Sequence, residues 1–352
     1  MRLRNRGRAV VAAPGGPGRS VMDRRKFVAG AALGFGAWVP AAGAQPAANV
    51  RRVGLLSSGG MRTDAEFRQS NWVLALRDLG WVDGQNVVFE RRAADGKADL
   101  VPALARELVR ANVDVIATFG GSDTLAAMQA TSAVPIVMVF SGVDPVEEGF
   151  AASFAKPGGN VTGVSRMLGE TDAKRLAYLR EVVPAAARIG VLAYAIADSD
   201  RKAKFEGRLR AAARDLHVAL EFFYYASQAD VDAAFPAMTG ARVQAFMLEP
   251  QFLTFRNRAR IAELALKHRL PGAFTLREYA EAGGLLSYGP DWPALERQHA
   301  RYVDRILRGA RPGDLPVEQP TKFDLVVNLA TAKALGVTVP PSLLLRADKV
   351  IE

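Results

Sequence analysis

From residue 50 onwards, short apolar runs rich in β-branched residues alternate with longer amphipathic segments. Strands are expected at 52–57, 86–91, 113–119 and 135–140, and helices at 64–79, 100–110 and 122–131. The strand runs are almost wholly apolar, which is typical of parallel strands that helices cover on both faces. The alternation therefore predicts βαβ units and a doubly wound parallel sheet.

The same order of elements recurs further along the chain. Gly54 in the first strand run has its counterpart in Gly190 of the run 188–193, and the run 134–138 answers to 270–274, both at an offset of 136 residues. The runs 220–223 and 245–248 answer to 87–90 and 115–118 at similar offsets. Since any α/β protein repeats βα units at similar spacing, coincidence stays open as the alternative. The repeat predicts two α/β lobes, with a ligand cleft between the carboxyl ends of their strands.

After the run 285–288 the pattern changes. A helix is expected at 295–308, followed by a Pro-rich stretch, an extended segment that reaches Phe323 and a short helix at 328–335. This tail is too small for a core of its own and is expected to dock on one or both lobes. The turn and extended segment 156–163 lie between the two repeats, so we expect the first crossing between the lobes there.

The first 44 residues have the layout of an export signal. Arg24 and Arg25 precede an apolar stretch of 27–40, and Ala42-Gly43-Ala44 follows it, which predicts cleavage near Ala44 and suggests the twin-arginine route. Met22 is a natural start for the same signal. A disordered basic tail is the alternative, but it does not account for the apolar stretch or for the small residues after it.

The net charge of +10 is concentrated in this leader. Residues 1–44 hold eight basic residues and one acidic residue, a net of +7, which leaves +3 for the rest of the chain. A body so close to neutral argues against nucleic-acid binding. The body has no second long apolar run, so no membrane insertion is expected.

The composition supports few kinds of chemistry. With no Cys there is neither a thiol nucleophile nor a lipid attachment point, and the three His are far apart in sequence, where they are expected on solvated helix surfaces. The motifs of serine hydrolases and phosphate-binding loops are missing. We therefore expect no enzyme activity, no metal and no cofactor.

Polar residues follow the predicted strands, and they are the candidate ligand-binding residues. Gly121, Ser122 and Thr124 begin a predicted helix, where free N–H groups suit a carboxylate. The other candidates are Ser57, Ser58, Ser141 and Asp144 in the first lobe and Tyr194, Glu249 and Thr275 in the second. Asp144 precedes Pro145, so helix capping is the alternative for its carboxylate, and packing is the alternative for Tyr194.

Several longer motifs resemble one known family. They are the segments 80–87, 144–146, 156–163, 284–289, 315–323 and 335–344. Together they resemble the periplasmic substrate-binding proteins of ABC transporters, in the tryptophan/tyrosine-binding-like family. The resemblance spans the chain from the leader to the last residues.

The resemblance implies a type I periplasmic-binding fold, with two α/β lobes joined by a hinge of three crossings. It places the leader at 1–44, the first lobe at 45–163 plus 288–322, and the second lobe at 164–287 plus 323–352. It also implies that the protein captures a small solute in the periplasm for an ABC permease in the inner membrane. Gly121, Ser122 and Thr124 are then expected to hold a ligand carboxylate, and Asp144 to face an amine.

Two other functions stay open at this point. A periplasmic sensor subunit that hands its ligand-bound form to a membrane kinase would have the same fold and cleft. An exported enzyme that uses the carboxylates of Asp144 and Glu249 is the second alternative.

Overall fold

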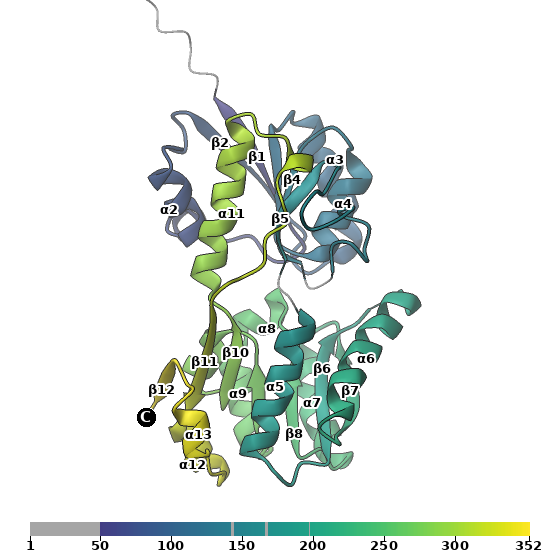
Figure 1. Cartoon of the computed structure of the whole chain (residues 1–352), viewed down its shortest axis with the longest axis vertical. Helices are drawn as coiled ribbons and strands as arrows, with labels where there is room; N and C mark the ends of the chain where they lie inside the picture. Colours follow the sequence, from purple (N-terminus) through teal and green to yellow (C-terminus); the bar gives the residue numbers. More distant parts are fainter. Residues whose placement is uncertain (1–49, 142–143, 166–167, 197) are drawn as a thin grey trace, which may run out of the picture. The chain divides into compact units, whose positions relative to one another are not determined.

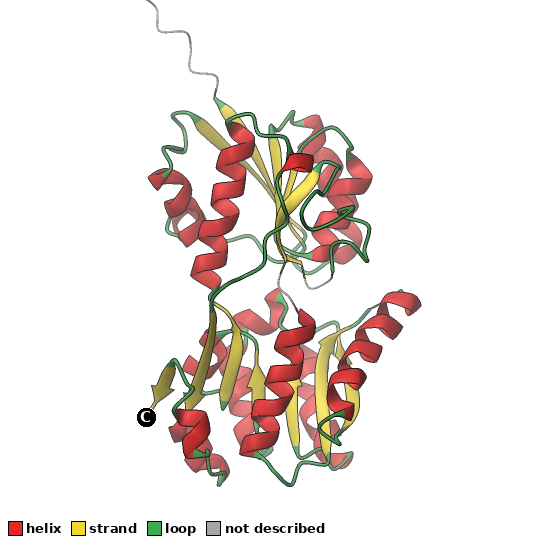
Figure 2. Ribbon diagram, viewed as in Figure 1, coloured by secondary structure: helices red, strands yellow, loops and turns green. Residues whose placement is uncertain are grey.

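The computed structural model describes residues 50–141, 144–165, 168–196 and 198–352, so the predicted leader and its cleavage point near Ala44 lie outside the described residues. The described part forms two α/β lobes, each built on one β-sheet with helices on both of its faces (Figures 1 and 2). The predicted fold class, two parallel-sheet α/β lobes, is confirmed.

The first lobe is built on a five-stranded parallel sheet. Its strand order is β2 (Val87–Ala93), β1 (Arg51–Ser57), β3 (Val115–Thr118), β4 (Ile136–Ser141) and β5 (Val161–Ser165). Helices α2 (Asn71–Asp78) and α11 (Trp292–Leu307) cover one face, and α3 (Val101–Arg110) and α4 (Gly121–Ala130) cover the other. The short helices α1 (Asp64–Arg68), η1 (Ala98–Leu100) and η2 (Pro312–Asp314) complete this lobe.

The second lobe is built on a seven-stranded sheet. Its strand order is β12 (Lys349–Ile351), β11 (Phe323–Asn328), β10 (Leu286–Pro290), β9 (Gly272–Phe274), β8 (Ala245–Leu248), β6 (Arg188–Tyr194) and β7 (Ala219–Tyr225). All pairs are parallel except β10 with β11. The larger helices are α5 (Leu168–Val182), α6 (Ser199–Arg214), α7 (Gln228–Gly240) and α9 (Arg258–Lys267); the shorter ones are α8 (Phe252–Arg256), α10 (Arg277–Glu281), α12 (Leu329–Leu335) and α13 (Pro341–Leu344).

The two sheets repeat one strand order. Reading β2-β1-β3-β4-β5 against β7-β6-β8-β9-β10, each strand of the first lobe has a counterpart in the second. Gly54 and Gly190 occupy matching places: a Cβ on Gly54 would lie 3.2 Å from Leu108, and one on Gly190 would lie 3.1 Å from Met238. In each lobe, therefore, the helix after the second strand packs directly on a glycine of the first strand.

Three expected elements differ in the structure. The helix expected at 64–79 is two helices, because Ser70 caps α2: its hydroxyl donates to the Phe67 carbonyl at 2.7 Å and accepts from the Val73 N–H. The extended segment expected to cross between the lobes instead ends in β5, an edge strand of the first sheet. The segment Phe323–Asn328, expected to end an extended stretch and begin a helix, is strand β11. These strands were missed because their pairing partners are distant in sequence.

The tail serves both lobes, as expected. Helix α11 packs on α2 and on β4 and β5 of the first lobe, while β11 and β12 extend the second sheet. Strand β10 runs to Pro290 within the second sheet, so the chain enters the first lobe at Asp291 and returns before Phe323.

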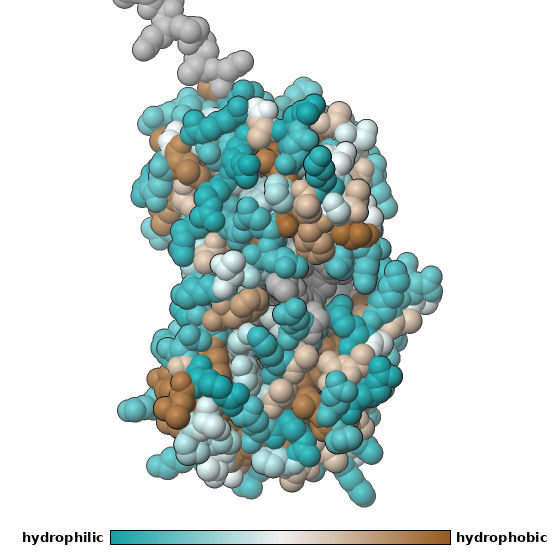
Figure 3. Space-filling view, viewed as in Figure 1, coloured by the Kyte–Doolittle hydropathy of each residue, from teal (hydrophilic) through white to brown (hydrophobic). Residues whose placement is uncertain are grey.

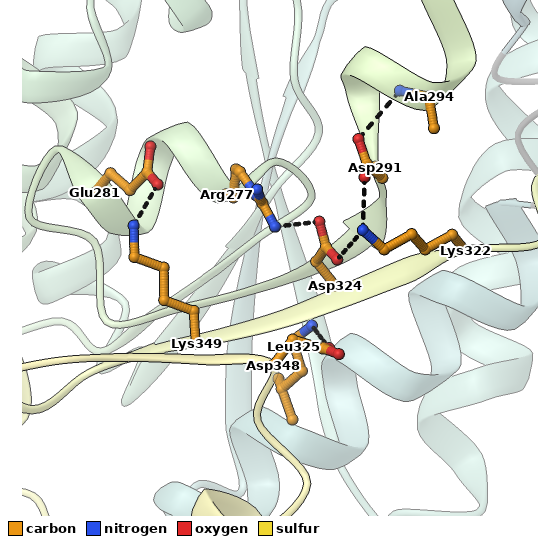
Figure 4. Close-up of polar contacts among 9 residues, drawn as sticks. All are labelled: Arg277, Glu281, Asp291, Ala294, Lys322, Asp324, Leu325, Asp348 and Lys349. Carbon is orange, nitrogen blue, oxygen red and sulfur yellow. Dashed lines mark hydrogen bonds and ion pairs between the residues drawn. The ribbon is translucent and has the colours of Figure 1, made fainter. Parts of the chain in front are cut away.

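An ion-pair cluster ties these last two crossings together (Figure 4). Asp291 caps α11, accepting from the Ala294 N–H at 3.1 Å, and its other oxygen accepts from Lys322 Nζ at 2.9 Å. Lys322 also lies 3.8 Å from Asp324, which pairs with Arg277 at 2.5 Å. Although burial opposes its ionisation, the contact with Lys322 holds the pKa of Asp291 below its ordinary value. The same cluster of ion pairs therefore joins the two segments that cross between the lobes.

Among the described residues, no helix is both long and apolar enough to cross a membrane. Hydrophilic residues cover most of the face drawn in Figure 3.

The edge strand β5 depends on Gly163, and this dependence is testable. Its φ is +132°, and a Cβ there would lie 2.1 Å from the Met138 carbonyl oxygen of the neighbouring strand. We expect Gly163→Ala to lower the free energy of unfolding by about 3 kcal/mol, since strain and overpacking combine. Urea denaturation measures the change.

The matched control is Gly159→Ala, just before β5, because a Cβ on Gly159 meets nothing within 4 Å. It should change the free energy of unfolding by no more than about 0.5 kcal/mol. Equal unfolding midpoints for the two variants would contradict the account of β5.

Candidate functional site

A cavity of about 1560 Å³ lies between the two lobes at the carboxyl ends of their strands. The first lobe lines it with the loops that follow β1, β2, β3 and β4, and the second with the segments that follow β6, β7 and β8. This is the place where two sheets of this strand order hold their ligands. The predicted cleft is present.

The wall of the first lobe is a rigid loop joined to the start of α4. Ser58 donates its N–H to Asp123 Oδ1 at 2.9 Å, and Gly59 donates its N–H to Ser57 Oγ at 3.0 Å. Gly120 is the N-cap of α4 and supplies no side chain, so the first N–H groups of that helix have no cap. Burial raises the pKa of Asp123 to about 7, although hydrogen bonds from Ser58 favour its charged form.

The wall of the second lobe rests on a buried ion network. Arg175 of α5 is fully buried; it donates to Asp172 Oδ1 at 2.5 Å, to the Leu248 carbonyl at 2.8 Å and to Glu249. Arg208 of α6 lies 3.4 Å from the other oxygen of Asp172 and itself lines the cavity. Two guanidinium groups thus balance two carboxylates. Burial, and repulsion from Glu249, raise the pKa of Asp172 to about 6.

The structure brings most of the predicted site residues together. Those that line the cavity are Ser57, Ser58, Gly121, Ser122, Asp144, Tyr194 and Glu249. Thr124 and Thr275 are not among the lining residues; both are buried. The Thr124 hydroxyl donates to the Gly120 carbonyl at 2.9 Å and lies 2.7 Å from the Thr118 hydroxyl. Ser141 ends β4, and its side chain is outside the described part of the structure.

The carboxylate of Asp144 caps a turn and not the expected helix, whereas the packing alternative for Tyr194 is seen. Asp144 is exposed and accepts from the Val146 N–H at 2.7 Å, so it caps its own turn while lining the cavity. Tyr194 packs edge-on against Tyr225, with ring centroids 5.7 Å apart, and also faces the cavity. Neither contact excludes a ligand.

Aromatic side chains also take part in the lining of the cavity. They come from both lobes: Phe67, Trp72, Phe119, Tyr194, Phe205, Phe252, Phe255 and Trp292. Such walls suit a ligand with a large apolar or aromatic part, because flat rings bury much surface and stack.

Sequence reasoning left out Arg175, Arg208 and the part that Asp123 plays in holding the loop. Asp123 gave a signal, since an acid at the third position of a helix is placed to accept from a nearby N–H. Arg175 gave none: it lies within a polar stretch of α5, and only the fold places Glu249 beside it.

The expectation for one histidine was wrong. His299, expected on a solvated surface, is fully buried; its Nε2 lies 2.9 Å from the Val137 carbonyl, and its ring packs on Trp72 and Phe119. Burial lowers the pKa of His299 to about 4. Packing of α11 on the first sheet puts this residue inside the core, although its basic neighbours in sequence indicated a surface.

Within the described residues, no group of three or more His, Cys, Asp or Glu side chains is arranged to hold a metal ion.

Two α/β lobes of matching strand order, with a deep cavity between them, define a two-lobed solute-binding protein. The chain belongs to the ABC transporter substrate binding protein family, whose model matches residues 69–351. Members of this family bind ligands and are not enzymes, so the enzyme alternative is set aside.

Known proteins agree with this assignment. The chain is 26% identical over 267 residues to the tyrosine-binding protein of Clostridioides difficile, and the matched stretch covers 76% of each protein. It is similar to the crystal structure of a conserved domain protein from Vibrio cholerae O1 biovar El Tor, with a TM-score of 0.75 and 26% identity over 86% of this chain and 99% of that one. It shares the fold of an ABC domain from Streptococcus pneumonia in complex with L-Trp, with a TM-score of 0.74 and 23% identity over 86% and 99% of the two chains.

Because His299 is buried, we expect acidification to lower the free energy of unfolding. The unfolded chain binds a proton near pH 6.5 and the folded chain only near pH 4, so acidification between these values favours the unfolded state. Above pH 6.5 this group adds no pH dependence. Relative to His299→Gln, the wild type should lose on the order of 3 kcal/mol between pH 6.5 and 4.

Urea denaturation at several pH values measures this difference. Gln keeps a donor for the Val137 carbonyl. His268→Gln, at a partly exposed position, is the control for loss of an imidazole. Parallel pH profiles for the wild type and His299→Gln would contradict the account.

Proposed function

We propose that this protein is the periplasmic receptor of an ABC importer and captures an aromatic amino acid or a related carboxylate between its lobes. The observation that carries the proposal is the cavity itself, which combines an uncapped helix start, cavity-facing carboxylates and aromatic walls. The printed ligands of two similar proteins, tyrosine and L-Trp, support the same class. A ligand that touches both lobes stabilises the closed state by its differential affinity.

The ligand carboxylate is assigned to the start of α4. Gly121 and Ser122 line the cavity there, and helix N–H groups favour a negative charge. Asp123 lies beside this place, and its raised pKa of about 7 means that it carries only part of a negative charge near neutrality. Repulsion of a bound carboxylate is therefore reduced.

The ligand amine is assigned to the carboxylates of the cavity wall. Asp144 keeps the role expected for it, since only one of its oxygens caps the turn in the contacts described. Glu249 is 7% exposed and is fixed by Arg175, so it offers a positioned carboxylate on the second lobe. The aromatic side chains then enclose the ring of the ligand.

A thermal-shift screen tests the proposal. Protein purified from the periplasm of its host is unfolded and refolded to remove any carried ligand, and is then tested with amino acids, their keto and hydroxy acids, aromatic acids and small amides. A ligand at 100 times its Kd adds about 2.7 kcal/mol, which raises Tm by several degrees. L-tryptophan or L-tyrosine should give such a rise. A flat screen on well-folded protein would contradict the ligand class.

Export and delivery belong to the same proposal. We expect the mature chain in periplasmic extracts, with an N-terminus near Gln45, and N-terminal sequencing tests this. A neighbouring gene for an ABC permease would support import, whereas a gene for a membrane kinase would favour the sensor alternative.

Ser122 lines the cavity, whereas Thr124, two residues further along α4, is buried. Substitutions at these two positions therefore separate ligand binding from packing. Ser122→Ala should weaken binding of the screen's best ligand about tenfold, since a lost hydrogen bond to a charged group costs roughly 1.5 kcal/mol. Thr124→Val should leave Kd unchanged and lower stability by about 1 kcal/mol, because its hydroxyl bonds within the protein. Isothermal titration and urea denaturation measure the two effects, and unchanged binding in Ser122→Ala would overturn the assignment.

A further inference from the structure

A side chain of the second lobe lies on a pair of glycines of the first lobe. A Cβ built on Gly59 would lie 2.7 Å from Cγ and 2.8 Å from Cβ of Phe252, and one on Gly60 would lie 2.5 Å from its Cε1. Neither glycine has a left-handed φ. These glycines are therefore needed because a ring from the other lobe approaches them closely, and not because of their backbone conformation.

The glycine pair is held rigidly in the first lobe. Asp95 donates its N–H to the Gly59 carbonyl at 2.9 Å, and Gly96 donates to the Ser58 carbonyl at 2.9 Å. On the other side, Ser58 donates to the buried Asp123. The loop is thus fixed from two directions, and we call Gly59 and Gly60 the glycine seat.

Phe252 is held just as rigidly in the second lobe. It is the first residue of α8, whose fully buried Thr254 is bonded to Gln251 at 2.9 Å and to the Tyr279 hydroxyl at 3.2 Å. The guanidinium of Arg256 lies 5.6 Å from the centre of the Phe252 ring. Two rigid parts that meet without space for a methyl group cannot approach further.

We propose that Phe252 is a positioning residue: its ring meets the glycine seat, limits how far the lobes close and so sets the size of the cavity. A second contact joins the lobes elsewhere on the cavity lining, where Arg201 of α6 lies 3.3 Å from Glu148 after β4. That pair is partly exposed and contributes little by itself. The proposal rests on the proposed function only in taking this cavity as the place of the ligand.

The absence of cysteine from the chain allows a direct test of contact. In the full chain carrying Gly59→Cys and Phe252→Cys, the two Cβ atoms start about 1 Å closer than the roughly 3.8 Å of a disulfide. We expect most of the protein to form this disulfide under mild oxidation without ligand. The control pair, Gly159→Cys with Phe252→Cys, should stay reduced. Failure of the first pair to cross-link without ligand would overturn the proposal.

A double-mutant cycle tests whether the contact of Phe252 with the glycine seat limits closure of the lobes; we call this contact the stop. Spin labels on Arg110→Cys of α3 and Ala237→Cys of α7, both exposed, report the distance between the lobes. Gly59→Ala should lengthen that distance, because its methyl group meets the ring. The same substitution in a Phe252→Ala background should lengthen it no further, and Gly159→Ala should have no effect. An unchanged distance in Gly59→Ala, or equal lengthening in both backgrounds, would overturn the proposal.

Binding of L-tryptophan separates this proposal from the proposed function. If L-tryptophan binds the wild type, Gly59→Ala should weaken it about tenfold and far less in the Phe252→Ala background. If the whole ligand screen is flat, L-tryptophan included, while the cross-link and the distance cycle behave as expected, the ligand class fails and the stop stands. Equal affinity of the wild type and Gly59→Ala would contradict the stop and leave the receptor function intact.

Discussion

The buried guanidinium of Arg175 is the charge on which the second wall of the cavity depends. It joins Asp172 of its own helix, the Leu248 carbonyl at the end of β8 and the carboxylate of Glu249. Removing one partner from such a network leaves a buried charge uncompensated, which typically costs about 3–5 kcal/mol. Helix α5 and the end of β8 are therefore held together, and the place of Glu249 in the cavity follows from this.

The first wall is built in a comparable way, with a buried acid at the carboxyl edge of the sheet. Asp123 accepts from Ser58 and so fixes the loop after β1 against the start of α4. Hydrogen bonds to buried carboxylates thus fix both walls of the cavity. Domain closure around a ligand is then a movement of two stiff bodies, and a close contact such as that of Phe252 on Gly59 decides where the movement stops.

The alternation of apolar runs and amphipathic segments predicted both lobes, and the offset between Gly54 and Gly190 predicted their shared order. Helix α5 was missed for a physical reason. Its buried side includes Thr171, Asp172 and Arg175 as well as Leu176 and Leu179, so the apolar period that indicates a helix is broken. Strand β11 was missed for a different reason: its partner β10 lies more than 30 residues earlier in the chain, so no local pattern marks the pairing.

The sequence alone determined that strands and helices alternate and that polar loops follow the strands, because both are local consequences of side-chain periodicity. It placed Ser122, Asp144 and Glu249 at strand ends, and the cavity lining includes all three. Only the tertiary structure decided that the Thr124 hydroxyl meets Thr118 of β3, that His299 is buried, and that Arg175 and Glu249 meet. These contacts join residues from separate elements, and packing of whole helices against sheets, not local pattern, sets such distances.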